Sequence, residues 1–190
     1  MASEILPFLL ETERLWIRQF RDDDLEAFLA YRNDPSVARW QGWDVPYPRE
    51  KAVEFVEEMK NKNPEEAGGW LQAAIVVKET GEFIGDCAFY IKKDETRTAH
   101  LGCTIMQKYW RNGYAVEATR RLMAYLFDDL HLRRLIADTD VENTGSWKTL
   151  EKLGFRREAH FVENIFFKGH YASEYHYAML DREWQMLKSA

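Results

Sequence analysis

The stretch that most constrains the fold runs over residues 98–130, where an alternating segment is followed by a short loop and a long amphipathic segment. Residues 98–106 alternate with period two and predict a strand, and apolar side chains at helical spacing after Gly113 predict a helix. The start of a helix presents free N–H groups and the positive end of its dipole, and glycine lets an anion come close. The stretch therefore predicts an anion site between a strand and a helix.

Further strands and helices are predicted on both sides of this stretch. Strands are predicted over 14–20, 70–78, 82–92, 134–140, 161–167 and 170–180, and helices begin after Asp24, Pro48 and Asn143. Hairpin turns at Thr80-Gly81 and Lys168-Gly169 make both ends of the order antiparallel, whereas the strand–helix–strand unit over 98–140 needs a parallel crossover. The pattern predicts a mixed α/β sheet with helices on its faces.

Composition argues against some classes of binding partner and indicates the cellular compartment of the protein. The 190 residues, 46% of them apolar, suit one domain over 1–190 with a core of its own. The formal charge of −6 argues against a nucleic-acid or anionic-membrane partner, because such binding needs a basic face, and no apolar run has membrane-spanning length. The start of the chain has no basic region, so we expect no secretory signal. Cys87 and Cys103 have no metal-ligand spacing, so we expect no metal site, no disulfide and a cytoplasmic location.

Four motifs then point to a known family. They are TERLWIRQF…DLEAFLAYRNDPSV near the start, GEFIGDCAF in a predicted hairpin, YWRNGYAVEA at the loop and helix, and ENTGSWKTLEKLGF near the end. Their order and spacing, over almost the whole chain, resemble the GCN5-related N-acetyltransferases (the GNAT superfamily) and, within it, the RimJ/RimL-like branch. The resemblance implies a mixed, mostly antiparallel α/β (α+β) sheet of about six to seven strands flanked by about four helices. It also implies direct transfer of an acetyl group from acetyl-CoA to a primary amine, on a protein N-terminus (a ribosomal protein among them) or a small molecule.

The resemblance assigns the predicted anion site to coenzyme A. In GNAT proteins the loop before the long helix binds the pyrophosphate through backbone N–H groups, and the pattern Gln/Arg-x-x-Gly-x-Gly/Ala maps onto Trp110 to Ala115, with Trp110 as a departure. The cofactor-binding residues implied are Thr104, Ile105, Met106, Arg111, Asn112, Gly113, Tyr114, Ala115, Asn143 and Ser146. The alternative to a cofactor-binding role is a structural one, in which Gly113 only forms the turn that leads into the helix.

Acetyl transfer to an amine needs a base, a donor for the oxyanion and help for the departing thiolate. The resemblance places a carboxylate where this chain has His100, and an imidazole titrates near neutrality, so we predict His100 as the base. A surface or packing histidine is the alternative. The oxyanion donor implied is a backbone N–H near Thr104, provided that the strand separates from its neighbour there.

Thiolate protonation is assigned to a serine. The Tyr that many GNAT proteins use has Glu151 in its place, whereas the RimL-like Asn-x-x-Ser is matched by Asn143 and Ser146. Ser146 is therefore the second catalytic candidate, although both residues also suit a helix cap. Cys103 falls on the strand face opposite His100, which favours packing and direct transfer over a covalent intermediate.

The acceptor site is the least specified part. Related proteins build it from the first two helices, their connecting loop and the C-terminal hairpin, so Trp40, Trp43 and Tyr171 are the substrate-binding candidates, with core packing as the alternative. Related proteins are often homodimers. Two other functions stay open: a non-catalytic acyl-CoA-binding or sensing module, and a P-loop nucleotide enzyme, which would require the Gly-Lys-Ser/Thr ending that Gly113-Tyr114 lacks.

Overall fold

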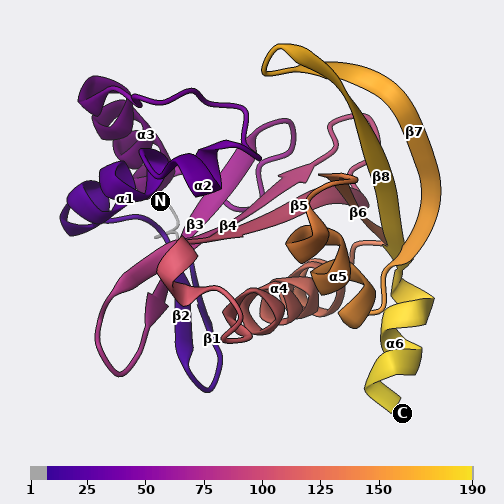
Figure 1. The fold of residues 1–190 in the computed structure, drawn as a ribbon. Helices are drawn as coiled ribbons and strands as arrows, with labels where there is room; N and C mark the ends of the chain where they lie inside the picture. The colour runs from indigo at the N-terminus through magenta and orange to yellow at the C-terminus, as the bar shows by residue number, and fades with distance from the viewer. Residues whose placement is uncertain (1–7, 190) are drawn as a thin grey trace.

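A computed structural model describes residues 8–189, in which the strands form a single mixed sheet (Figure 1). The spatial order is β1-β2-β3-β4-β5-β6-β8-β7, and neighbouring strands are antiparallel except β5 and β6, which are parallel. The strands are β1 (Leu9–Glu11), β2 (Leu15–Arg18), β3 (Trp70–Val77), β4 (Phe83–Ile91), β5 (Thr98–Ile105), β6 (Arg134–Asp140), β7 (Arg156–Phe167) and β8 (His170–Leu180).

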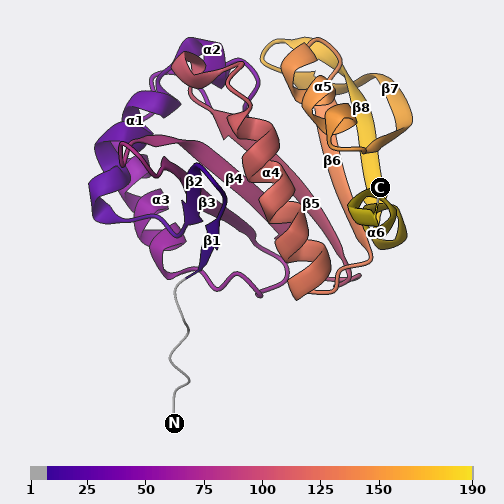
Figure 2. The same cartoon turned by 90° about the horizontal axis from the view of Figure 1, so that it is seen from below.

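Helices cover both faces of this sheet. They are α1 (Leu25–Arg32), α2 (Pro35–Ala38), α3 (Arg49–Asn61), α4 (Tyr114–Ala124), α5 (Thr144–Lys152) and α6 (Asp181–Ser189), and a π-helical turn (Tyr125–Asp129) extends α4. Figure 1 shows α1, α2 and α3 on one side of the sheet and α4 and α5 on the other. Figure 2 shows α4 lying along β4 and β5, with α5 beside β6 and β8. β5 and β6, which are joined through α4, are the parallel neighbours among the described strands. β6 and β7, which are joined through α5, also run parallel to each other, because both are antiparallel to β8 between them.

Two apolar cores hold the layers together. The larger one joins the α4 and α5 face of the sheet, where Leu122 of α4 and Leu126 of the π-helical turn share one core with Leu101 of β5. The smaller one lies under α1 and α3 and includes Phe28 and Val56. Alternate residues of each strand point to opposite faces, so β5 gives Leu101 to the larger core and leaves the other face for polar side chains.

The predicted mixed sheet is confirmed, and its element count needs correction. The sheet has eight strands and the chain six α-helices within the described residues, against the six to seven strands and about four helices expected. The additional elements are β1, α2 and α6. β1 has 3 residues and α2 has 4, which is too short for a periodic pattern to stand out. β7 also begins at Arg156, ahead of the predicted residue 161, because its exposed charged start shows no alternation.

Residues 1–7 and residue 190 lie outside the described residues. The predicted absence of a secretory signal concerns the start of the chain, and so falls largely on residues that the structure does not describe. Within residues 8–189 no helix is long and apolar enough to cross a membrane.

Candidate active site

The site opens where β5 and β6 separate. The two strands pair at Thr98, Ala99 and His100 of β5, and no pairing with β6 is recorded for the rest of β5. A cleft of about 1130 Å³ lies there, between the carboxyl halves of the two strands, the starts of α4 and α5, and the segment around α2. A ligand site at the carboxyl ends of diverging parallel strands is the position expected for such a crossover.

Backbone N–H groups of β5 face this opening. In an antiparallel pair, successive residues alternate their hydrogen-bonding groups between the two sides of the strand. The N–H of Met106 donates to Ile84 (2.8 Å) and the carbonyl of Thr98 accepts from Lys92 (2.9 Å), so even-numbered residues bond toward β4. The N–H groups of Cys103 and Ile105 therefore point to the side where β6 has left the ladder. They flank Thr104, near which the sequence predicts an oxyanion donor.

The loop before α4 has the backbone shape of an anion cradle. Arg111 (φ 64°) and Gly113 (φ 81°) are both in the left-handed region, and Gly113 begins α4 without a side-chain cap. The first intrahelical bond recorded runs from Glu117 N–H to the Gly113 carbonyl, which leaves the N–H groups of Tyr114 and Ala115 without intrahelical acceptors. Both residues line the cleft, so these donors are available to a phosphate.

An arginine from the strand side holds the loop in place. Arg14 donates to the carbonyl of Asn112 (Nη1, 3.2 Å) and pairs with Glu117 on α4 (2.6 Å), and its guanidinium lies 4.5 Å from the ring centre of Tyr114. Burial raises the pKa of Glu117, but hydrogen bonds from Thr12 and Arg14 outweigh it and lower the pKa below its usual value. The loop thus rests on an ionised carboxylate inside the first turn of α4.

The start of α5 closes the cofactor side of the cleft. Asn143 caps α5, its Oδ1 accepting from the N–H of Ser146 (3.3 Å), which confirms the cap predicted for Asn143. Both residues line the cleft. Thr119 of α4 also lines it, and its Oγ1 is buried without a hydrogen-bond partner. An orphaned buried hydroxyl on a cleft wall fits a ligand with polar atoms along its length, as coenzyme A has.

Three titratable side chains meet at the point where β5 and β6 separate. Nδ1 of His100 lies 3.4 Å from Asp138 Oδ2, and Nδ1 of His176 lies 2.6 Å from Asp138 Oδ1. Burial raises the pKa of Asp138, but hydrogen bonds from both imidazoles outweigh burial and lower it below its usual range. His100 and Asp138 both line the cleft.

The cleft floor on the α1 side is a buried polar cluster. Tyr31 donates to Asp86 (3.0 Å), and Arg32 donates to Gln72 (2.9 Å) while its guanidinium lies 3.7 Å from the Trp43 ring centre. Burial raises the pKa of Asp86, and burial together with Asp86 raises that of Tyr31 well above its usual value. Nε of Arg32 is buried without a partner. This end of the cleft therefore holds a buried guanidinium with one N–H group unpartnered, beside a buried carboxyl group.

The cleft brings together most of the predicted site residues. Those that line it are His100, Thr104, Ile105, Arg111, Gly113, Tyr114, Ala115, Asn143, Ser146, Trp40 and Trp43. Thr104 directs its hydroxyl to the α2 side, where it accepts from Gln41 (3.1 Å). Three predicted residues do not line it. Asn112 instead bonds the carbonyls of Tyr109 and Trp110 from its own side chain, and Tyr171 is 66% exposed on the β7–β8 hairpin.

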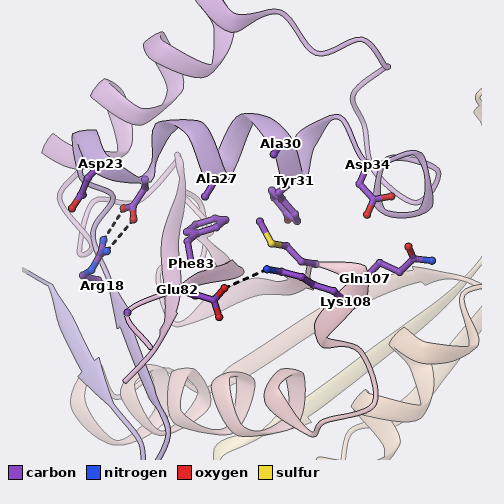
Figure 3. A pocket seen from close by; sticks show the side chains of 13 residues that line it. Arg18, Asp23, Ala27, Ala30, Tyr31, Asp34, Glu82, Phe83, Gln107 and Lys108 are labelled. Atoms are coloured by element: carbon purple, nitrogen blue, oxygen red, sulfur yellow. Dashed lines mark hydrogen bonds and ion pairs between the residues drawn. The ribbon is translucent and has the colours of Figure 1, made fainter. Parts of the chain in front are cut away.

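The third of these, Met106, lines a second, smaller pocket of about 590 Å³ between α1 and the β3–β4 turn (Figure 3). The cationic groups there already have carboxylate partners, because Arg18 pairs with Asp24 (2.7 Å) and Lys108 with Glu82 (3.5 Å). The carboxylates of Asp23 and Asp34 also line this pocket.

Sequence reasoning did not identify several residues of the cleft. Asp138 is the most consequential, and the signal for it was an acidic residue within a predicted strand, directly after the apolar run Leu135 to Ala137. Thr119 and Arg32 had no sequence signal, because a threonine or arginine on a helix is ordinarily solvated. Cys103, expected to pack, does pack against the larger core and also lines the cleft, while Cys87 is buried beside it. Both cysteines are free, and the described residues hold no His, Cys, Asp and Glu group suited to a metal ion.

Comparisons with known proteins agree with this geometry. A family model described as an acetyltransferase (GNAT) domain matches residues 14–156. The chain is 31% identical over 175 residues to the uncharacterised N-acetyltransferase YnaD of Bacillus subtilis (strain 168), covering 92% of this chain and 98% of that protein. A solved GNAT-family acetyltransferase from Bacillus anthracis superposes with a TM-score of 0.80 at 29% identity, covering 92% and 99% of the two chains.

A spermidine N-acetyltransferase from Vibrio cholerae, solved with CoA and spermine, shares the fold with a TM-score of 0.78 at 19% identity, covering 92% and 99% of the two chains. A protein named as a putative ribosomal N-acetyltransferase, YdaF of Bacillus subtilis (strain 168), is 27% identical over 105 residues, covering 55% of this chain and 57% of that protein, in agreement with the RimJ/RimL-like resemblance.

Proposed function

This chain belongs to the GNAT acetyltransferase family and is an acetyltransferase, and we propose that it transfers an acetyl group directly from acetyl-CoA to a primary amine in the cleft between β5 and β6. The observation that carries the proposal is that one cleft joins an uncapped helix start, free strand N–H groups and an imidazole. The helix start suits the phosphates of the cofactor, and the strand N–H groups and the imidazole supply the oxyanion donor and the base that thioester aminolysis needs. We also propose that residues 1–190 work as one domain around this cleft.

The cofactor would lie along the α4 and α5 side. The loop N–H groups of Gly113, Tyr114 and Ala115 suit its pyrophosphate, with Arg111 adding charge, and Asn143 and Ser146 suit its sulfur end. Bound there, acetyl-CoA supplies an activated thioester. The N–H groups of Cys103 and Ile105 then face the position in which the acetyl oxygen becomes negative.

On the opposite wall, His100 takes the proton from the acceptor amine, and Ser146 is the candidate for returning a proton to the thiolate. The acceptor enters from the α2 side, past Trp40 and Trp43. Carboxylates of Asp138, Asp140 and Glu174 line the same cleft and favour an acceptor that arrives as an ammonium ion. Such an acceptor is a protein N-terminus or a small amine.

Release of free thiol from acetyl-CoA tests the proposal. The protein is mixed with acetyl-CoA and a panel of peptides with free N-termini, polyamines and aminoglycosides, and acetylated products are identified by mass. We expect thiol release that depends on one class of amine. Substituting His100→Ala lowers kcat by about a hundredfold or more at neutral pH, because a positioned base contributes about 10²–10⁴, while acetyl-CoA affinity is nearly unchanged.

The alternative of an acyl-CoA-binding or sensing module makes a different prediction. It expects a thermal shift with acetyl-CoA and no thiol release with any amine in the panel. An unchanged rate and pH profile in His100→Ala would show that the base assignment is wrong even where transfer occurs. We further propose a cytoplasmic location, supported by the two free cysteines.

A further inference from the structure

Three neighbouring strands bring two imidazoles to one carboxylate. Asp138 on β6 lies between His100 on β5 (3.4 Å) and His176 on β8 (2.6 Å), each contact being made by Nδ1 of the imidazole. The strand register explains the meeting, because Asp138 is the direct partner of His176 and β6 pairs with β5 at His100. The three side chains form a row across the sheet at the point where β5 and β6 separate.

The central carboxylate is kept ionised by its neighbours. The hydrogen bonds from His100 and His176 hold the pKa of Asp138 below its usual range in spite of burial. An ionised carboxylate accepts hydrogen bonds and donates none, so the ring nitrogen that faces it carries the proton. In neutral His100 the proton is then on Nδ1, and Nε2 keeps its lone pair.

The two imidazoles have different surroundings. His100 lines the cleft, and its ring is also held by an edge contact with Tyr90 of β4, at 6.4 Å between ring centres. His176 is not among the cleft-lining residues and packs against Phe161 of β7, at 6.3 Å. The charged groups that act on Asp138 are these two imidazoles, and the further carboxylates of the cleft wall, Asp140 and Glu174, lie along β6 and β8. Only His100 can therefore meet a substrate.

We propose that Asp138 is a positioning residue that sets the tautomer and orientation of His100, and that His176 fixes Asp138 from the other side. The inference rests on the proposed transfer reaction, in which His100 is the base. A base oriented in this way presents Nε2 to the acceptor, because the imidazole ring is already held in one orientation.

Every proton of the acceptor amine has a destination in this arrangement. The acceptor R–NH₃⁺ gives one proton to Nε2 of His100, and the imidazolium is stabilised by Asp138, which stays ionised. The free amine attacks the thioester carbonyl, so that an N–C bond forms and the C–S bond breaks. The second nitrogen proton goes to the departing thiolate, giving the N-acetyl amine and the coenzyme A thiol. His100 then releases its proton to water.

The variant Asp138→Asn tests the positioning role. The amide keeps the shape of the side chain but removes the charge, and its NH₂ group can donate to Nδ1 and favour the wrong tautomer. We expect kcat to fall by about tenfold or more, with the KM for acetyl-CoA within about twofold. The shape of the pH–rate profile changes as well, because the base is no longer held in one tautomer. The control is Glu158→Gln, which removes an ion-paired carboxylate of β7 outside the cleft and leaves rate and profile unchanged.

A second measurement needs neither turnover nor a variant. Nitrogen-detected NMR of the parent protein labelled at histidine reports the tautomer of each neutral imidazole, and we expect Nδ1–H in His100. Observation of Nε2–H in His100 would overturn the inference whatever the activity. Nδ1–H together with an unchanged kcat and pH profile in Asp138→Asn would overturn the positioning role and leave the proposed function standing. Absence of transfer by the parent protein would instead overturn the proposed function.

Discussion

Gly85 of β4 is the position where a single added carbon should disturb the cleft most. It pairs with Ile105 across β4 and β5, has φ +153°, and a Cβ built there would lie 2.1 Å from the carbonyl oxygen of Thr104 and 2.9 Å from Cα of Ile105. Restoring an ordinary contact of 3.4 Å to that oxygen requires the strands to move apart by about 1.3 Å, the difference between 3.4 and 2.1 Å. β6 has left the ladder there, so β5 moves into the cleft.

The cost of Gly85→Ala follows from these distances. Overpacking costs about 1–3 kcal/mol, and a backbone region reserved for glycine adds about 1–3 kcal/mol. At about 2–4 °C per kcal/mol for a chain of this size, the lower bound of about 2 kcal/mol lowers Tm by at least about 4 °C. Displacement of the N–H groups of Cys103 and Ile105 by about 1 Å lowers kcat/KM by about tenfold to a hundredfold.

Thermal unfolding followed by circular dichroism, together with thiol-release kinetics, measures both effects. The stability control is Gly102→Ala on β5, where an added Cβ meets nothing within 4 Å, so its Tm stays at or slightly above that of the parent. If Gly85→Ala unfolds within about 1 °C of Gly102→Ala and keeps the parental kcat/KM, then the spacing of β4 and β5 at Gly85 does not set the geometry of the cleft.

The other predictions concern the loop, α5 and acid stability. Gly113→Ala strains a φ of 81° by about 1–2 kcal/mol, and the added Cβ meets nothing closer than 3.6 Å. Calorimetry should therefore show the affinity for acetyl-CoA reduced by about tenfold. The control Gly169→Ala, at φ 91° in the remote hairpin, should lower the stability of the protein and leave its affinity for acetyl-CoA unchanged. Ser146→Ala should raise the KM for acetyl-CoA, and a parallel fall in kcat would show proton donation as well. The Glu158 pKa is lowered from 4.5 to about 2, chiefly by the hydrogen bond from Arg134, so its contribution to stability is present above pH 4.5 and is lost as pH falls toward 2. Acid unfolding of Glu158→Gln should therefore be less steep in that window, and equal slopes would contradict the assignment.

Local sequence patterns predicted the elements that carry the cofactor side. The turn at Gly113, the cap at Asn143 and the strand over Thr98–Ile105 all depend on residues close in the chain, and the structure contains each of them. Gly154, which follows the last turn of α5, has φ 92°, the left-handed conformation that glycine commonly adopts at the C-terminal end of a helix. Patterns of this kind are set by backbone sterics and capping, which the sequence encodes locally.

The acceptor side could not be predicted in the same way. Asp138 meets His100 only because β5 and β6 are parallel with a particular register, and that register depends on the packing of the 28-residue crossover, 106–133, that joins them. Tyr171 was placed in the acceptor site because it is an aromatic residue of the C-terminal hairpin. The hairpin instead leaves it exposed against Phe166, since β7 lies at the sheet edge. Strand separation after His100 has no sequence signal that we recognise.

In the proposed reaction acetyl-CoA lies across the opening between β5 and β6 with its acetyl group beside His100. A crystal structure of the protein with coenzyme A tests this placement. We expect the pyrophosphate on the N–H groups of Gly113, Tyr114 and Ala115, and the sulfur between Ser146 and the N–H of Ile105. Phosphates bound elsewhere, or a sulfur on the far side of the sheet from His100, would contradict it.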